Sequence, residues 1–363
     1  MKNYVTAGGV PFPINDTLIK IFKTLLTVEQ AKFLLGFRKR SLNINQIKAK
    51  TDLDDKALDR MLNNLMDDGL IIGLPSRSTG IMVYYLIPIL PGLFEYPFMK
   101  GEKGEKQKKL SILLNKLIDE FGQLTQSNYD ELVKQFMKGN PLDRVVPVKK
   151  EVEIHQDVVL PYEDIKHIIA NHDIISVNHC YCRNWKENLG DPCKLDAPNL
   201  NCLSFGRTAR FLIDHNFGKQ ISNEEAIKIL EEAEDIGLVH KAFHVQQNPE
   251  QEIQTLCNCC NCCCQIFEFY KRGSAPFRTF TSYIANVDVD KCKGCGTCVE
   301  KCPIEAIEIV DTLSVTNTDK CLGCGVCAHH CPENARTLER TGLREVFIPP
   351  PKIAEHDLKL IQT

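Results

Sequence analysis

The sequence reads CKGCGTCVEKCP over residues 292–303 and CLGCGVCAHHCP over residues 321–332. In both stretches the cysteines are spaced C-x2-C-x2-C-x3-C, and a proline follows the last one. A glycine also stands on each side of the second cysteine in both stretches. The two stretches are therefore an internal repeat, and they are the strongest signal in the chain.

The spacing has a chemical reason. Three thiolates at such short steps can surround one side of a compact metal cluster, because glycine lets the backbone turn tightly around it. Where two [4Fe-4S] clusters are bound, the fourth cysteine of each run binds the other cluster. The predicted ligand sets are Cys292, Cys295, Cys298 and Cys331 for one cluster, and Cys321, Cys324, Cys327 and Cys302 for the other.

A pair of zinc ribbons is the alternative for this repeat. Zinc ribbons need only C-x2-C pairs, so the third and fourth cysteines and the Cys-Pro endings go beyond that pattern. The repeat resembles bacterial-type dicluster ferredoxins, over about 60 residues. This resemblance implies that the C-terminal part transfers single electrons at low potential.

Composition sets broad limits on the rest. A chain of 363 residues is long enough for two or three domains. Its net charge of −3 indicates neither nucleic acid nor an anionic membrane as a bulk partner. Residues 1–13 lack the apolar run of a signal peptide, and the apolar segment 81–90 is too short to span a bilayer. With 18 cysteines in metal-type spacings, we expect a cytoplasmic protein of a reducing, oxygen-poor cell.

Helix and strand signals alternate between residues 16 and 89. Apolar spacing predicts helices from residue 16 to about 35, from 44 to 50 and from 55 to 68, followed by a hairpin. This order resembles a winged helix-turn-helix domain, in which the helix at 55–68 would occupy the recognition position. Residues 52–68 contain six acidic and two basic side chains, and this balance repels phosphates. We therefore expect the domain to dock a protein, with nucleic acid as the less favoured partner.

A second group of ten cysteines lies between residues 180 and 264. A short strand leads into HCYCR at residues 179–183, and Cys193 and Cys202 follow in segments with loop composition. Cysteines two apart on an extended chain face the same side, so we expect Cys180 and Cys182 to share a site. Helices are predicted at residues 206–215 and, from its capping box, at residues 223–236, and CNCCNCCC follows at residues 257–264.

So many cysteines in one segment indicate a metal-binding module. A tetrahedral zinc site formed by Cys180, Cys182, Cys193 and Cys202 is one interpretation. One or two further iron–sulfur clusters are favoured, because the neighbouring repeat already indicates that chemistry. The sequence leaves open which of the six crowded cysteines bind metal. The candidates taken forward from that group are Cys257, Cys259, Cys260 and Cys263.

Arg183 directly follows Cys182. Its guanidinium could donate hydrogen bonds to cluster sulfur or offset the charge of bound thiolates, and it is therefore a candidate cofactor-binding residue. A surface salt bridge is the alternative. Among the nearby histidines, His179 is the best placed as a further ligand, although most histidines are ordinary polar residues.

These motifs also occur together in one known setting. C-x-C-R, two spaced cysteines, IGLVH at residues 236–240 and CNCCxCCC together resemble a family of largely uncharacterised dicluster-ferredoxin proteins of anaerobic bacteria and archaea. The resemblance covers most of the chain from the winged helix onward. It implies no substrate.

We therefore expect an α+β multidomain protein. Its predicted parts are a winged helix-turn-helix-like domain at residues 1–96, a helical linker at 97–150, a central α/β cysteine-rich metal module at 151–278, a dicluster ferredoxin-like domain at 279–341 and a Pro-containing tail at 342–363.

The predicted function is iron–sulfur electron transfer to or from a partner oxidoreductase, as a component of that system rather than a stand-alone enzyme. One alternative is a redox-responsive regulator that binds DNA. Another is an iron–sulfur enzyme with its active site in the central module. No nucleotide fingerprint, P-loop or flavin motif stands beside the cysteines, so a catalytic site is expected in the partner.

Overall fold

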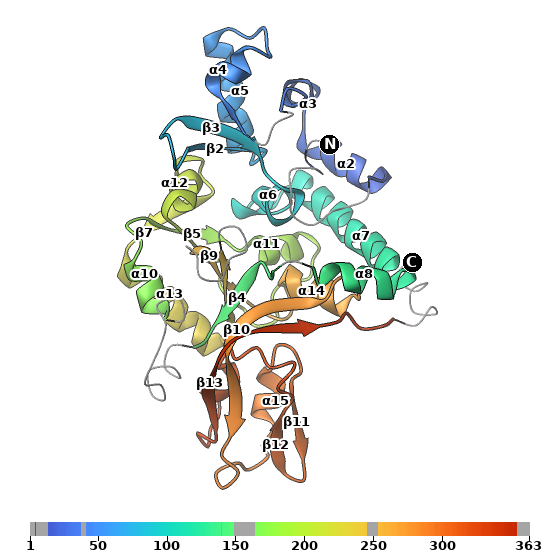
Figure 1. Ribbon diagram of the computed structural model, residues 1–363, viewed down its shortest axis with the longest axis vertical. Helices are drawn as coiled ribbons and strands as arrows, with labels where there is room; N and C mark the ends of the chain where they lie inside the picture. The colour runs from blue at the N-terminus through green and yellow to red at the C-terminus, as the bar shows by residue number, and fades with distance from the viewer. Residues whose placement is uncertain are drawn as a thin grey trace.

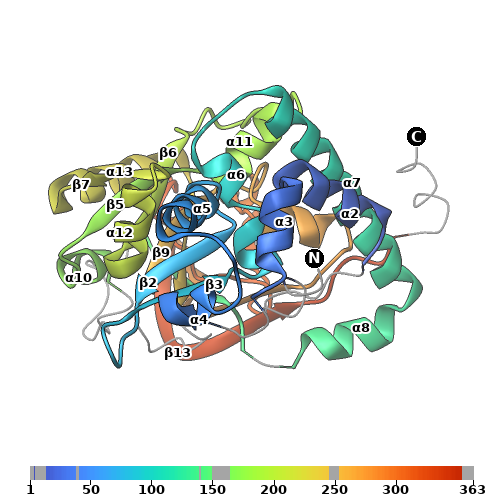
Figure 2. The same cartoon turned by 90° about the horizontal axis from the view of Figure 1, so that it is seen from above.

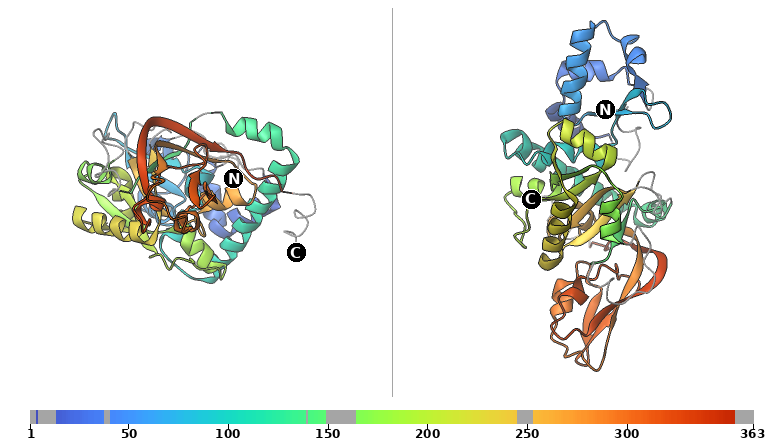
Figure 3. Two further views of the ribbon diagram at one scale, coloured as in Figure 1. Left: turned by 90° about the horizontal axis from the view of Figure 1, so that it is seen from below. Right: turned by 90° about the vertical axis from the view of Figure 1, so that its left-hand side faces the viewer.

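The computed structural model describes residues 4, 14–37, 41–138, 140–148, 164–244 and 253–353. The chain is arranged in three levels along its longest axis: an N-terminal part, a central sheet covered by helices, and a small tip (Figure 1). The right-hand view of Figure 3 shows the same three levels from the side. The elements of the tip are α15 (Thr297–Lys301), β11 (Ile307–Val310), β12 (Leu313–Thr316) and α16 (Val326–His329).

The N-terminal part contains the helices and the hairpin predicted from apolar spacing. Thr27 caps the second helix in a capping box with Gln30. Its small sheet is antiparallel, with strand order β1-β3-β2. The helices are α2 (Asp16–Leu25), α3 (Val28–Leu34), α4 (Ile44–Lys48) and α5 (Asp55–Asp67). The strands are β1 (Leu42–Asn43), β2 (Ile71–Pro75) and β3 (Met82–Leu86).

A second group of helices joins this part to the central sheet. After a π-helical turn (Ile89–Leu93) come α6 (Tyr96–Met99), α7 (Glu105–Ser127) and α8 (Tyr129–Phe136). The long helix α7 packs against α2 and also against α11 (Tyr181–Asn188) of the central part. From above, α7 runs along one side of the N-terminal helices (Figure 2). The segment predicted as a helical linker is thus part of a packed core.

The central sheet has eight strands in the order β13-β10-β4-β8-β9-β6-β5-β7. Neighbouring strands are antiparallel except β10 and β4, which are parallel. The strands are β4 (Asp143–Val146), β5 (Ile175–His179), β6 (Leu200–Phe205), β7 (Gly218–Ile221), β8 (Val239–His244), β9 (Ile253–Cys259), β10 (Phe277–Val287) and β13 (Arg336–Ile348).

Helices flank this sheet where the sequence signals place them. Ser222 and Glu225 form the predicted capping box of α13, and Gly237 ends that helix at a φ of 90°. The helices are α10 (Ile165–Ala170), α11, α12 (Gly206–Asp214), α13 (Asn223–Ile236) and α14 (Gln265–Lys271).

The two longest strands connect the sheet to the tip. β10 pairs with β13 over most of its length, from Phe277 opposite Ile348 to Val287 opposite Arg336. The boundaries predicted at residues 279 and 341 therefore lie inside two continuous strands, and β4 lies inside the predicted linker. The cysteine spacing and the turn residues show where the two cysteine runs lie. They do not show that the strands flanking these runs continue into the central sheet.

The predicted tail begins within β13, and its described end lies against α7 and α8. Gln126 donates from Nε2 to the Pro351 carbonyl at 3.1 Å, and its Oε1 accepts from the Ile353 amide at 3.0 Å. Tyr129 donates to the Pro350 carbonyl at 2.5 Å. Residues 349–353 thus fold back onto the body of the chain. Among the helices in the described ranges, none combines the length and apolar character that crossing a membrane requires.

Trp185, the only tryptophan in the chain, lies where the N-terminal and central parts meet. It is 2 % exposed, stacks on Phe98 at a ring-centroid distance of 5.8 Å, and donates from Nε1 to the Ser111 carbonyl at 3.2 Å. Trp185→Ala should therefore lower the free energy of unfolding by about 3–5 kcal/mol, because it leaves a large cavity. Anaerobic urea unfolding followed by circular dichroism measures this loss.

Leu124→Ala is the control for this prediction, because Leu124 lies on α7 and is 41 % exposed. Its effect should stay within about 0.5 kcal/mol. Equal destabilisation by the two substitutions would contradict a shared core between the two parts.

Candidate metal centres

The eight cysteines of the repeat line two separate cavities. The first is lined by Cys292, Cys295, Cys298 and Cys331, here called the outer set. The second is lined by Cys302, Cys321, Cys324 and Cys327, here called the inner set. Each set takes three cysteines from one run and one from the other, and these are the two sets named from the sequence. Four thiols around a cavity are the donor chemistry that a [4Fe-4S] cluster requires.

Glycines let the backbone wrap these cavities. Gly294 and Gly323, at equivalent places in the two runs, both have a φ of 61°. A Cβ at Gly294 would lie 2.3 Å from the Thr312 carbonyl oxygen, and one at Gly323 would lie 2.2 Å from the Tyr283 carbonyl oxygen. Only glycine satisfies both the left-handed conformation and this close approach of backbone.

The two sets differ in exposure. Cys295 of the outer set is exposed, whereas all four cysteines of the inner set are buried. Burial raises the pKa of Cys324 well above its usual value. Cys324 also holds the inner loop to the sheet, because its carbonyl accepts from the Val148 amide at 3.0 Å. The inner set therefore faces the body of the protein, and the outer set faces solvent at the tip.

One buried cation lies beside both sets. Arg336 is 3 % exposed, lines the outer cavity, and donates to Ser314 Oγ at 3.2 Å and Thr316 Oγ1 at 2.6 Å. Burial raises the pKa of the inner Cys327 to about 12, and the charge of Arg336 opposes this rise. A guanidinium in this place offsets the negative charge of thiolates in both sets.

The central module contains a third cavity lined by cysteines. Seven cysteines line it, and one of them, Cys260, belongs to a second group described below. The other six are here called the six-cysteine ring: Cys180, Cys182, Cys202, Cys257, Cys259 and Cys264.

Several elements supply this ring. Cys257 and Cys259 are two apart on β9, so they face the same side of the strand, and Cys202 comes from β6, the neighbour of β9. Cys264 stands at the N-terminus of α14. The expectation that Cys180 and Cys182 lie on extended chain is wrong for Cys182, because α11 begins at Tyr181. The two thiols are nevertheless neighbours, since the strand-to-helix turn brings the first turn of α11 to the strand end.

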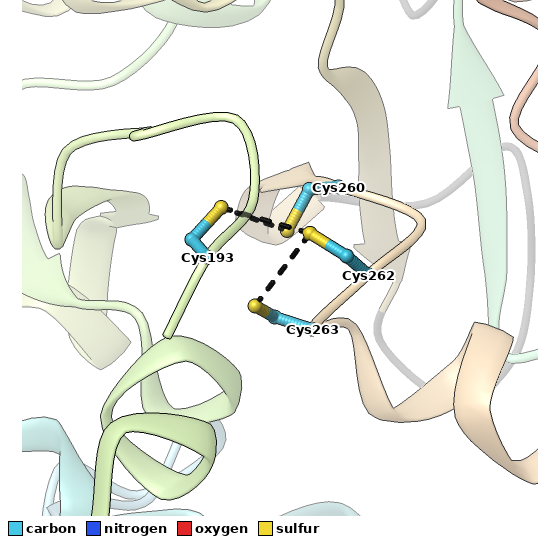
Figure 4. Close-up of side chains that lie close together, drawn as sticks. All are labelled: Cys193, Cys260, Cys262 and Cys263. Atoms are coloured by element: carbon cyan, nitrogen blue, oxygen red, sulfur yellow. Dashed lines mark hydrogen bonds between the residues drawn. The ribbon is translucent and has the colours of Figure 1, made fainter. Parts of the chain in front are cut away.

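The remaining four central cysteines form a compact group. Cys193 comes from the loop after α11, and the other three come from the turn between β9 and α14 (Figure 4). The Sγ of Cys193 lies 3.7 Å from those of Cys260 and Cys262, and the Sγ atoms of Cys262 and Cys263 are 3.8 Å apart. We call Cys193, Cys260, Cys262 and Cys263 the tetrad.

The tetrad has the size of a site for one ion. Four sulfurs at about 2.3 Å from a central zinc stand about 3.8 Å apart in a tetrahedron. The three sulfur distances given above agree with this value. The central module thus contains a group of cysteines that could hold a metal ion.

The structure changes the grouping proposed for zinc. Cys180, Cys182 and Cys202 belong to the ring, whereas Cys193 belongs to the tetrad. The structure therefore does not support one zinc site formed by these four residues, because contacts across the sheet determine which thiols lie together. Two residues outside the candidate ligands also join the groups, Cys262 in the tetrad and Cys264 in the ring. In eight residues containing six cysteines, no spacing signal separates the two groups.

Arg183 lies between the two groups and is fully buried, so it forms no surface salt bridge. Its Nη1 donates to the Pro198 carbonyl at 2.9 Å and to Asn201 Oδ1 at 2.5 Å, and its Nη2 donates to the Asn258 carbonyl at 2.8 Å. Burial alone would lower the pKa of Arg183, but nearby thiolates, Cys180 first among them, raise it. The guanidinium is held by neutral acceptors, and thiols of both groups are near enough to act on its charge.

A buried polar network continues from this arginine. Asn258 donates from Nδ2 to the Asn201 carbonyl at 2.5 Å, and its Oδ1 lies 2.6 Å from His240 Nδ1. Glu234 Oε1 lies 3.4 Å from His240 Nε2. His240 thus supports the loop that carries the cysteines. His179 packs on Gly101 and is absent from the lining of the cavity at the ring, so its place does not support it as a ligand.

Comparison with protein-family models matches residues 284–332 to a 4Fe-4S dicluster domain. This segment contains both cysteine runs and therefore all eight cysteines of the outer and inner sets. The comparison with curated proteins gave no match, and neither did the comparison with solved structures. The C-terminal tip of this chain is thus similar to 4Fe-4S dicluster domains, which supports two iron–sulfur clusters there.

Proposed function

We propose that this protein transfers low-potential electrons between a partner oxidoreductase and a series of metal centres. The outer and inner sets would hold two [4Fe-4S] clusters, and at least one further centre would follow in the central module. The observation that carries the proposal is one continuous apolar core. It contains all four cysteines of the inner set together with Cys259 and Cys264 of the six-cysteine ring.

The outer set is the proposed point of exchange with the partner. It is the set with an exposed cysteine, and it lies at the end of the molecule away from the N-terminal part. The inner set is buried between the tip and the sheet, where Arg344 donates from Nη2 to the Cys321 carbonyl at 2.5 Å. Electrons would therefore pass from the outer set through the inner set toward the central module.

For the N-terminal part we propose a winged helix-turn-helix arrangement that docks a protein. The helices α4 and α5 followed by the β2–β3 hairpin support it. Acidic residues on α5 argue against DNA: Asp55 and Asp59 are exposed, and Lys48 is paired with Asp55 at 2.6 Å. The proposed domains are residues 1–96, 97–150, 151–278 and 279–341 with a tail after them, although packing and strand pairing join them into one body.

Removing the outer cluster should slow electron transfer to external acceptors. In the full-length protein, Cys295→Ser should lower the rate of electron transfer to oxidised cytochrome c, used as a surrogate acceptor, by at least about tenfold. The physical reason is that the remaining centres are buried. Stopped-flow absorbance under anaerobic conditions, after dithionite has been removed, measures this rate.

Cys324→Ser is the matched control, because Cys324 holds the same place in the second run. It should leave the fast transfer from the outer cluster in place but reduce the number of electrons delivered per chain. An unchanged rate in Cys295→Ser would rule out the outer set as the point of exchange.

The N-terminal part should not bind duplex DNA. We expect no saturable binding of the full-length protein to a labelled duplex at low salt, in the oxidised or the reduced state, because the acidic face of α5 repels phosphates. Fluorescence anisotropy measures this. The double substitution Asp55→Lys and Asp59→Lys should create weak, salt-sensitive binding on the same face. Salt-sensitive binding by the unmodified protein would instead support a regulator.

A further inference from the structure

The ten central cysteines fall into two groups that differ in how closely their sulfurs lie together. The six cysteines of the ring lie around a cavity. Within the described residues, the tetrad is the one group of metal-binding side chains whose donor atoms all lie within 4.8 Å of one another. The ring is therefore too open for a single ion.

The outer and inner sets provide a reference inside the same chain. Both line cavities, and neither has all its sulfurs within 4.8 Å of one another. The ring shows the same two features. Its geometry thus matches sets that surround a cluster and differs from a set that holds one ion.

The number of thiols separates the ring from the outer and inner sets. A single cubane takes four thiolates, whereas the six cysteines of the ring all line one cavity. We propose that the six-cysteine ring binds one polynuclear iron–sulfur cluster through all six thiolates, two more than a single cubane takes, and that the tetrad binds one separate tetrahedral ion. This inference concerns metal binding and stands whether or not the protein transfers electrons.

Arg183 supports thiolate chemistry at both sites. It is fully buried, and among the described residues its hydrogen bonds go to carbonyls and an amide, not to a carboxylate. Its Nε has no hydrogen-bond partner among them. A buried cation of this kind is costly unless negative charge lies nearby. Metal-bound thiolates of Cys180 and Cys202 in the ring, and of Cys193 and Cys260 in the tetrad, supply that charge.

Iron fits the ring better than other thiophilic metals. Soft thiolates bind copper(I) and zinc as well as iron–sulfur clusters, so the ligands alone do not decide. The ring, however, has a cavity like those of the dicluster segment and shares a core with the inner set. Assembly needs iron ions and sulfide from the medium. Each ring thiol loses its proton to solvent as its sulfur bonds to iron, and no thiol is oxidised.

The test is metal and sulfide analysis of the full-length protein after anaerobic reconstitution with iron and sulfide. Two cubanes account for about eight irons and eight sulfides per chain. We expect at least about four more of each from the ring, and one further ion at the tetrad without sulfide. A total of about eight irons and eight sulfides would overturn the proposal, and so would zinc or copper in the ring without extra sulfide.

Single serine substitutions at the six ring positions test the ligand number. Each substitution should lower the iron and sulfide contents per chain by equal amounts, or it should shift the Mössbauer spectrum of the ring cluster. The matched control, Cys262→Ser in the tetrad, should remove one ion and no sulfide. The spectra of the two ferredoxin-type clusters report whether each variant is folded. If two of the six substitutions change neither content nor spectrum, the ring holds a four-thiolate cubane and the six-thiolate proposal is wrong.

If the ring variants fail to fold, the sulfide content of the unmodified protein still shows whether the ring binds an iron–sulfur cluster. Its excess over about eight sulfides per chain is the direct measure of a cluster outside the dicluster segment. Cytochrome c reduction and sulfide content are separate readouts, so failure of electron transfer and failure of cluster binding are distinguishable.

Discussion

The pairing of β10 with β13 is the interaction on which the rest of this structure depends. These two strands run antiparallel from Phe277 opposite Ile348 to Val287 opposite Arg336, with an irregularity between Thr281 and Tyr283. They end the central sheet on one side and carry the dicluster segment at their far ends. Because both strands are continuous, the inner set is held against the sheet rather than on a flexible linker. Shared apolar residues then connect it to the six-cysteine ring.

Burial of sulfur charge is the second constraint. Thiolates away from water need nearby cations or hydrogen-bond donors, since an unpaired buried charge is strongly unfavourable. Arg336 serves the outer and inner sets, and Arg183 lies between the ring and the tetrad. Backbone amides add to this, as the Ala285 amide donates to Cys321 Sγ at 3.4 Å and the Gln265 amide donates to Cys182 Sγ at 3.3 Å. The buried arginines thus fit the same chemical role at different levels of the molecule.

Cysteines form different kinds of candidate metal site in different parts of this chain. In the repeat, fixed short spacings and glycines in left-handed conformation bring four thiols around each cavity. In the central module, the sheet brings the thiols together. It pairs β6 with β9, and the N-termini of α11 and α14 lie at strand ends. A turn of adjacent cysteines facing the loop of Cys193 forms the compact tetrad. Spacing alone governs the first kind of site, and long-range contacts govern the other two.

Much of the local structure could be predicted from the sequence. The capping boxes at Thr27 and Ser222, the end of α13 at Gly237 and the β2–β3 hairpin follow from neighbouring residues. The membership of the outer and inner sets follows from the repeat, because its spacing and the exchange of the fourth cysteine are local rules. Only the tertiary structure decided the rest. It divided the ten central cysteines into a ring and a tetrad, placed Arg183 between them, and continued the strands of the tip into the central sheet. The physical reason is that these outcomes depend on pairing between strands far apart in the chain, and adjacent cysteines such as Cys263 and Cys264 carry no signal of which partners the fold brings to them.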